Sequence, residues 1–445
     1  MKKILAILIS VSILFVFLNA FSTKELPVDI NDKSKLLLEE KRESKGEIIG
    51  TAGKGVVALR FDDYQDAFRE NIYPLLIARG LPCSMALISR FCTAQAWGKG
   101  TTWDDIRTWN RNGVEIWSHG TDHKDYCTNG NSGLYDQIVT SKAEIEKQNI
   151  KVEGWVLPGV SPSTTTLPYN GLTSPEDYNS EVGRLIMQTY ALSEAYAYNA
   201  QRILPSNLFH GLNHITVSEK TTLESSKKVI NDAIKNKTGI EIMCHAGNLD
   251  KPGNMTLSQF TELLDYIKEQ WDMGSIEVLT PSGLCFADPN SKNRLSLNTD
   301  GSFERLTIEN HGLWNSTGNW NNQTIETTGG KTGSNFLRIY NSSANGGVTQ
   351  RIDNLDQLGV CGGQFLFECW IRSYESEDIT GAIRIEDSFN LKNLQIIHQV
   401  ESSDSMWKHV RFSFGIPSDT KSISISLYNL EGNGIDWDDV SIKII

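Results

Sequence analysis

Residues 56–66 read VVALRFDDYQD, in which four apolar residues lead through Arg60 and Phe61 to two adjacent aspartates, Asp62 and Asp63. The apolar part predicts a buried strand. Adjacent carboxylates at the end of a buried strand repel each other, so a bound cation or a proton has to compensate them. The stretch therefore predicts a charge-compensated site where the strand ends. A second interpretation remains for Asp63, as the N-cap of the helix that follows.

Short apolar strands alternate with amphipathic helices from residue 51 to residue 288. The expected strands are Val56–Phe61, Ser84–Ile88, Val114–Ser118, Trp155–Leu157, Ile240–Cys244 and Ile276–Leu279. The expected helices are Gln65–Arg79, Trp103–Asn112, Gly133–Gln148, Leu223–Lys235 and Leu257–Met273. Three of these helices are followed by a glycine, which commonly ends a helix. Repeated strand–helix–strand units predict a parallel sheet or an α/β barrel.

The pattern changes after Pro289, and residues 300–445 lack helical periodicity. Short alternating segments separated by Gly, Asn and Ser take over. They read NFLRIYN (335–341), GVTQRID (347–353), QFLFECWIRS (364–373), GAIRIED (381–387), HVRFSFGI (409–416) and SISISLYNL (422–430). This alternation predicts an all-β sandwich that is large enough to fold alone.

The N-terminus reads as an export signal. Two lysines precede an almost wholly apolar run that ends in small residues near residue 22. The run is short for a membrane span, so residues 1–22 are expected to be a cleaved signal peptide, with an uncleaved N-terminal anchor as the alternative. Residues 23–50 are polar and charged, and we interpret them as a spacer. The protein is therefore expected to be secreted or associated with the cell envelope.

Composition limits the classes of partner. The 445 residues carry a net charge of −12, which argues against nucleic acid and anionic membrane surfaces. Nothing in the sequence implies a protein partner, and a monomer is expected. The seven cysteines are an odd number without a CxxC pair, so a thiolate zinc site is not expected. Buried free thiols and a partial disulfide framework both remain open.

Histidines follow two further strands. VEIWSHGTDH (114–123) places His119 and His123 four residues apart, and IEIMCHAGN (240–248) ends with His245 close behind its strand. In parallel α/β folds, the carboxyl ends of the strands gather the functional groups. If residues 119–123 turn helically, both imidazoles face one way, and two histidines with one carboxylate suit a divalent cation with open positions. HGLNH (210–214) has the same spacing and is not dismissed.

The segments RFDD, HGTDH and MCHAG, in this order, resemble the polysaccharide deacetylase (NodB-homology, carbohydrate esterase) family over residues 54–284. The resemblance implies a distorted (β/α) barrel that uses a divalent metal to remove acetyl groups from N-acetylated or O-acetylated glycans. Zn²⁺ is the favoured metal, with Co²⁺, Ni²⁺ or Mn²⁺ as alternatives.

The resemblance also implies roles for five residues. By position in the motifs, Asp62 matches the catalytic base and His245 the general acid. Asp63, His119 and His123 match the metal ligands. The two adjacent aspartates would then divide the work, since one binds the metal and the other accepts a proton from the attacking water.

Three positions depart from the family pattern. Gly120 stands where Ser or Thr is usual, although Thr121 follows it. In GWVLPGV (154–160), Val156 replaces an arginine that normally neighbours the base, and Gly159 replaces an aromatic residue. Another residue would have to supply that arginine. No Asp-x-x-x-Trp motif is present to orient His245.

Residues next to the motifs are the expected substrate contacts. They are Tyr64, Trp155, Pro158 and Gly159, whose backbone N–H is a candidate oxyanion donor. In the C-terminal part, FERLTIENHGLWNS (303–316), GSNFLRIYN (333–341) and GIDWDDVSIKI (434–444) resemble jelly-roll carbohydrate-binding modules. Asp438 or Asp439 is a candidate ligand for a structural Ca²⁺.

The sequence thus predicts a metal-dependent hydrolase that removes acetyl groups from an extracellular or cell-wall polysaccharide, with N-deacetylation favoured over O-deacetylation. One alternative is a non-catalytic glycan-binding protein with a decayed deacetylase barrel. Another is a different hydrolase on the same barrel, acting on cyclic amides or peptide bonds.

Overall fold

The structure is a computed structural model. It describes residues 36–41, 45, 48–91, 100–123, 130–158, 177, 179–194, 200–205, 212–305, 314–317, 322–340 and 346–445, without the side chains of residues 130–132. The expected signal peptide, most of the spacer, Gly159 and His210 lie outside these residues. Within them, no helix is both long enough and apolar enough to cross a membrane.

A mostly parallel sheet forms the centre of the first half of the chain. Its main order is β5-β4-β3-β2-β8-β6, with β7 also paired to β8 and β9 to β2. The strands are β2 (Gly55–Asp62), β3 (Cys83–Leu87), β4 (Val114–Ser118), β5 (Val152–Trp155), β6 (Gln201–Arg202), β7 (His214–Thr216), β8 (Gly239–Cys244) and β9 (Ile276–Leu279). Every residue of β2, β3, β4, β5, β8 and β9 is buried, as expected for parallel strands with both faces covered.

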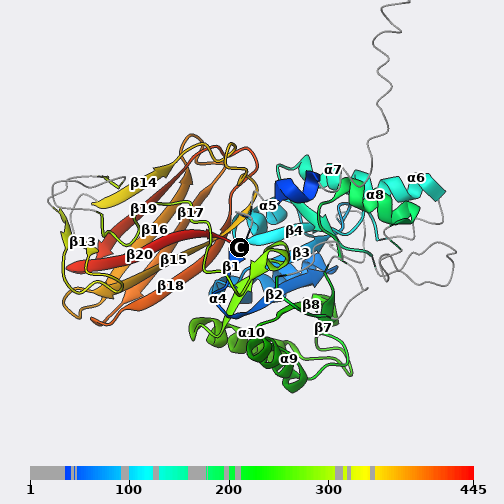
Figure 1. Cartoon of the computed structure of the whole chain (residues 1–445), viewed down its shortest axis with the longest axis horizontal. Helices are drawn as coiled ribbons and strands as arrows, with labels where there is room; N and C mark the ends of the chain where they lie inside the picture. Colours follow the sequence, from blue (N-terminus) through cyan, green and yellow to red (C-terminus); the bar gives the residue numbers. More distant parts are fainter. Residues whose placement is uncertain are drawn as a thin grey trace, which may run out of the picture.

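Helices surround this sheet (Figure 1). They are α3 (Gln65–Ala67), α4 (Tyr73–Arg79), α5 (Trp103–Arg111), α6 (Gly130–Tyr135), α7 (Ser141–Glu146), α8 (Glu181–Thr189), α9 (Leu223–Asn236), α10 (Leu257–Asp272) and α11 (Pro281–Cys285). Two of the expected helices contain a π-helical turn, η1 (Phe68–Ile72) and η3 (Asp136–Thr140). Such turns often lie near functional sites. Capping boxes at Thr102, Thr222 and Thr256 begin α5, α9 and α10.

The expected barrel is seen only in part. Beyond β5, isolated bridges take the place of continuous ladders. One bridge joins Trp155 to Ser193, and another joins Glu194 to Leu212, just before β7. Backbone hydrogen bonds accompany them, since Glu194 N–H donates to the Trp155 carbonyl at 2.8 Å and Leu212 N–H to the Ser193 carbonyl at 3.0 Å. The structure therefore shows an α/β unit with a parallel sheet, and a closed barrel stays a prediction.

Two five-stranded antiparallel sheets form the C-terminal part, in the orders β11-β14-β19-β16-β17 and β12-β13-β20-β15-β18. Their strands are β11 (Asn315–Ser316), β12 (Gln323–Glu326), β13 (Phe336–Tyr340), β14 (Gly347–Ile352), β15 (Gln364–Ser373), β16 (Ile379–Asp387), β17 (Gln395–Ser402), β18 (Lys408–Gly415), β19 (Ile423–Glu431) and β20 (Gly434–Ile444). Trp314 and Trp437 are buried and belong to the core of this part. The predicted all-β region is confirmed.

The sandwich packs against the end of the α/β unit where the parallel strands begin, and the two parts lie side by side in Figure 1. Gly113, directly before β4, lies so close to Ser413 that a Cβ would clash. Gly80, between α4 and β3, lies so close to the Arg411 carbonyl that a Cβ would clash there too. Arg411 donates to the Trp271 carbonyl at 3.0 Å and stacks on its ring. Asp62, His119 and His245 follow the opposite ends of their strands.

We expect Glu368→Gln to weaken this junction in a pH-dependent way. Glu368 accepts from Lys443 Nζ at 2.5 Å and pairs with Arg411 Nε at 2.9 Å. Burial would raise the pKa of Glu368, but these two cations lower it to about 2. The depressed pKa stabilises the fold above the ordinary pKa of the carboxyl, and this contribution is lost as the pH falls toward 2.

The substitution should cost about 2 kcal/mol of unfolding free energy at pH 7, with the difference from wild type narrowing below about pH 4. Denaturant unfolding at pH 7, 5 and 3 measures this. A cost that stays constant across that range would contradict the assignment.

Candidate active site

The chain makes a sharp turn where β2 ends, and this turn presents the two aspartates. Asp63 and Tyr64 both have left-handed backbone conformations, with φ of 58° and 44°. Non-glycine residues rarely adopt this conformation, and such strain concentrates at functional sites. Asp62 lies two residues after Arg60 on the same face of β2, whereas Asp63 points toward the end of β4.

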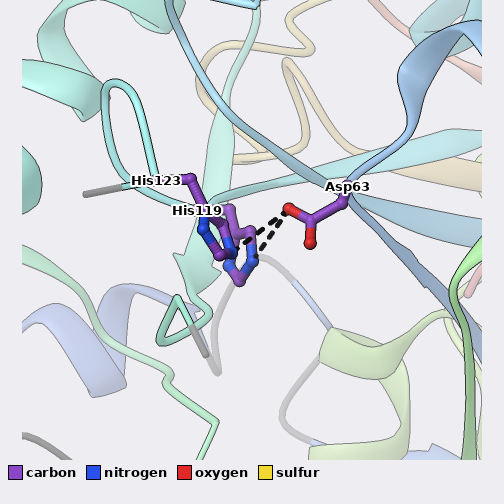
Figure 2. Close-up of side chains that lie close together, drawn as sticks. All are labelled: Asp63, His119 and His123. Atoms are coloured by element: carbon purple, nitrogen blue, oxygen red, sulfur yellow. Dashed lines mark ion pairs between the residues drawn. The ribbon is translucent and has the colours of Figure 1, made fainter. Parts of the chain in front are cut away.

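Asp63, His119 and His123 converge on one point (Figure 2). Asp63 Oδ1 lies 3.4 Å from His119 Nε2 and 3.4 Å from His123 Nε2. All three ligand atoms lie within 4.8 Å of one another, and no other group of three or more potential ligands is present among the described residues. The structure therefore brings together the three residues expected to bind metal.

This geometry suits a shared cation better than direct hydrogen bonds. Nitrogen and oxygen ligands about 2.0–2.1 Å from a tetrahedral Zn²⁺ lie about 3.3 Å apart, whereas good N–H···O bonds measure about 2.9–3.0 Å. Asp63 Oδ1 is buried and makes no hydrogen bond in the described structure. A buried carboxylate oxygen without a hydrogen bond, facing two imidazole nitrogens, is a donor set that fits a divalent cation.

The two histidines are positioned by different means. His119 Nδ1 lies 2.9 Å from the Val156 carbonyl, which can only accept, so Nδ1 carries the proton and Nε2 faces the cluster. His123 has φ of 57° and lies in a loop of bends. Residues 119–123 do not form a helical turn, and a left-handed residue brings the two rings together instead.

Burial and the neighbouring charges shift the pKa values of both histidines. Burial alone would lower the pKa of His119, but Asp63 outweighs it and raises that pKa. Burial and the neighbouring His119 lower the pKa of His123. The Asp63 pKa is lowered because its interaction with His119 outweighs its burial.

Steric contacts explain why position 120 is a glycine and not the usual serine or threonine. Gly120 has φ of 82°, and a Cβ there would collide with Gln137 Oε1. Gln137 lies in the π-turn η3 and holds the loop, because it accepts from Thr121 N–H at 3.1 Å and donates to Thr121 Oγ1 and Asp122 Oδ1 at 2.8 Å. A serine or threonine at position 120 would displace this support.

Arg60 supplies the arginine that the strand end at Val156 lacks. Its Nε donates to Asp62 Oδ1 at 2.7 Å and its Nη2 to Asp62 Oδ2 at 3.0 Å, a two-point contact between buried groups. Burial would raise the pKa of Asp62, but Arg60 outweighs it and lowers that pKa. The signal was present in the sequence, since an arginine in an apolar strand two residues before an aspartate shares its face.

His245 approaches the cluster from the end of β8. Its Nε2 lies 3.9 Å from Asp63 Oδ2, and its side chain is 23% exposed. Its Nδ1 lies 3.0 Å from Glu219 Oε1, an ion-pair contact without hydrogen-bond alignment. Glu219 in turn accepts from Asn248 Nδ2 at 2.6 Å. Glu219 therefore stands where an orienting carboxylate was missing, and no sequence motif marked it.

The structure gives different outcomes for the four expected substrate contacts. Tyr64 is partly exposed and meets the His245 ring edge-on at a centroid distance of 6.4 Å, so its contact with substrate stays a prediction. Trp155 is corrected, because it is fully buried and packs on Tyr190. Pro158 is buried beside Gly120, and its role stays a prediction. Gly159 lies outside the described residues.

The calcium prediction gains no support from the described residues. Asp438 Oδ2 accepts hydrogen bonds from the backbone N–H groups of Lys331 and Thr332 at 2.6 and 3.3 Å, and Asp439 accepts one from the Thr332 hydroxyl.

Five cysteines are described, and all five are free thiols.

Comparison with known proteins supports the family resemblance. The family model for polysaccharide deacetylase matches residues 49–170, which include Asp62, Asp63, His119 and His123 but not His245. The resemblance predicted from the sequence is thus confirmed over this range, and the match supports deacetylation of a polysaccharide. Among curated proteins, none matches the chain.

Solved structures that match cover the C-terminal region. The CBM22-1 xylan-binding domain of Paenibacillus barcinonensis Xyn10C is 12% identical, covers 35% of this chain and 97% of its own, and has a TM-score of 0.28. The C-terminal family 22 carbohydrate-binding module of Clostridium thermocellum Xyn10B is 16% identical, covers 33% and 96%, and has a TM-score of 0.26. TmCBM61, in complex with β-1,4-galactotriose, is 15% identical, covers 33% and 97%, and scores 0.27.

Replacing one histidine should remove the metal. We expect His119→Ala to lose bound divalent metal, because one nitrogen ligand and its carbonyl anchor both go, whereas Asp62→Asn keeps the metal. Metal per chain after dialysis, measured by inductively coupled plasma mass spectrometry, tests this. His409→Ala, in the sandwich, is the control and should keep the metal. Wild-type metal content in His119→Ala, or metal-free Asp62→Asn, would overturn the ligand assignment.

Gly120→Ala should disturb the metal loop as well as the backbone. Gly253 has nearly the same φ, 81°, but nothing lies within 4 Å of a Cβ there, so Gly253→Ala isolates the backbone cost of about 1 kcal/mol. Gly120→Ala adds the collision with Gln137 and should weaken metal affinity at least tenfold. Titration calorimetry with Zn²⁺ compares the two variants, and equal affinities would refute the steric explanation.

Proposed function

We propose that this protein is an exported, metal-dependent hydrolase that removes acetyl groups from a polysaccharide. The observation that carries the proposal is the convergence of the Asp63–His119–His123 cluster with Asp62 and His245 at the carboxyl ends of β2, β4 and β8. The polysaccharide deacetylase match over residues 49–170 supports the same reaction class. The apolar N-terminal run supports export to the envelope or the medium.

A divalent cation held by Asp63, His119 and His123 would polarise the acetyl carbonyl and lower the pKa of a water molecule. Zn²⁺ suits two imidazole nitrogens and one carboxylate oxygen, although Co²⁺, Ni²⁺ and Mn²⁺ accept the same set.

Asp62 and His245 handle the protons. Asp62 is held as a carboxylate by the Arg60 fork, so it can accept the proton of the attacking water. His245 is partly exposed and lies beside Asp63 and Glu219, so it can donate a proton to the departing amine or alcohol. We favour the amine of an N-acetylated sugar, with an acetylated hydroxyl as the second substrate class.

The sandwich would act as a second contact with the glycan. A second binding contact raises the local substrate concentration without changing the chemistry. Because it packs at the far end of the α/β unit, it would bind polysaccharide away from the reacting sugar.

Acetate release from acetylated glycans tests the reaction. The panel comprises chitin-type oligomers, poly-N-acetylglucosamine, peptidoglycan and acetylated hemicellulose, assayed with added Zn²⁺ or with chelator. We expect chelator-sensitive release, reduced at least 10²-fold in Asp62→Asn at unchanged metal content. If metal-loaded protein releases no acetate from any of these glycans, the glycan-binding alternative is favoured.

A further inference from the structure

We propose that Glu194 and His214 are positioning residues, which hold the Arg60 guanidinium in the one orientation that presents its fork to Asp62. The inference rests on the proposed function, because it assigns Asp62 the role of base. Neither residue belongs to the motifs that resemble the deacetylase family. The sequence shows the spacing of His214 from His210 but assigns His214 no role.

The Arg60 guanidinium is fully buried, and acceptors surround it. Nε and one Nη2 proton serve Asp62, as described above. Nη1 donates to Glu241 Oε1 at 2.6 Å and pairs with Glu194 Oε1. Nη2 also lies 3.2 Å from His214 Nδ1. Each nitrogen of the guanidinium therefore faces an acceptor, although the contact with Glu194 Oε1 is an ion pair without hydrogen-bond alignment.

These acceptors come from separate parts of the sheet. Glu194 lies in the bridged segment beyond β5, His214 opens β7, and Glu241 lies on β8, directly opposite His214 in the ladder. Their side chains are at most 6% exposed. Central strands of a parallel sheet are usually apolar on both faces. Burying ionisable groups there is costly unless each is paired, so these residues form a built polar cluster.

The cluster also controls charge. Burial would raise the pKa of Glu194, but Arg60 and His214 lower it to about 2, so Glu194 is ionised. Burial and the neighbouring Glu194 raise the pKa of Glu241 well above its ordinary value. Arg60 thus faces two carboxylates on different sides, Asp62 and Glu194, and cannot turn toward one without leaving the other.

Removing the charge of Glu194 would leave Arg60 free to rotate about its long side chain, because Nη1 loses its ion-pair partner. A rotated guanidinium no longer offers Asp62 two parallel hydrogen bonds, and the base loses its fixed orientation. Neither Glu194 nor Arg60 belongs to the Asp63–His119–His123 cluster. The expected signature is therefore a loss in kcat, with KM and metal content preserved.

Glu194→Gln keeps the shape of the side chain and removes its charge. We expect kcat on the best glycan substrate to fall at least tenfold, with KM and metal per chain within twofold of wild type. The matched control is Glu277→Gln. Glu277 is also a buried glutamate of the α/β unit, paired with Lys54 and Arg294 at the opposite strand ends. The control should keep its kcat. An unchanged kcat in Glu194→Gln, or an equal loss in both variants, would overturn the proposal.

His214 allows a second test if Glu194→Gln does not fold. The Oδ1 atom of asparagine can take the place of imidazole Nδ1, whereas leucine offers no acceptor. We expect His214→Asn to keep most of the kcat and His214→Leu to lose at least tenfold. Equal activity in the two variants would refute a role for the His214 acceptor.

A readout without turnover separates this inference from the proposed function. The Arg60 Nε–H, followed by ¹⁵N NMR in the full chain, should exchange slowly with solvent in the wild type and at least tenfold faster in Glu194→Gln. Slow exchange that the substitution does not change overturns the positioning role. If the Arg60 Nε–H exchange changes as predicted but the protein releases no acetate, the positioning role is supported and the deacetylase function is rejected.

Discussion

Two neighbouring negative charges at the end of β2 set the requirements for the rest of the site. Asp62 and Asp63 are nearly buried, with exposures of 4% and 5%, and each needs its own positive partner. Arg60 serves the first from within the strand, and His119 and His123 face the second from the end of β4. Because the partners differ, one carboxylate is committed to an arginine while the other keeps an oxygen free for a cation.

The supporting residues follow from this division. The Asp63 side depends on a strained loop, with Gly120 fitted against Gln137 and His123 in a left-handed conformation. The Asp62 side depends on buried ion pairs deep in the sheet. The sandwich contributes to neither, because it closes the opposite end of the α/β unit through β18 and β20. Its contribution to the fold is a firm junction, in which Arg411 joins Glu368 to the backbone of α10.

The strands were readable from the sequence because central parallel strands are continuous apolar runs, and the helices because their faces are periodic and capped. The metal cluster was readable because strand ends gather at one edge. The π-turns, α8 and the bridged segment around Ser193 were not, because tertiary contacts and not local preference decide them. Trp155 was misjudged because adjacency to a motif says nothing about which face of a strand a side chain occupies. Glu219 and Glu194 become visible only in three dimensions.

Placing the arginine on the same strand as its aspartate changes what the protein can tolerate. An arginine on β5 would depend on the distance between two separate strands, so any drift between them would loosen the pair. With Arg60 and Asp62 two residues apart, the backbone of a single strand sets their separation. The strand end from Val156 onward is therefore not needed to pair with Asp62, and changes in its length or sequence would leave Asp62 and Arg60 together.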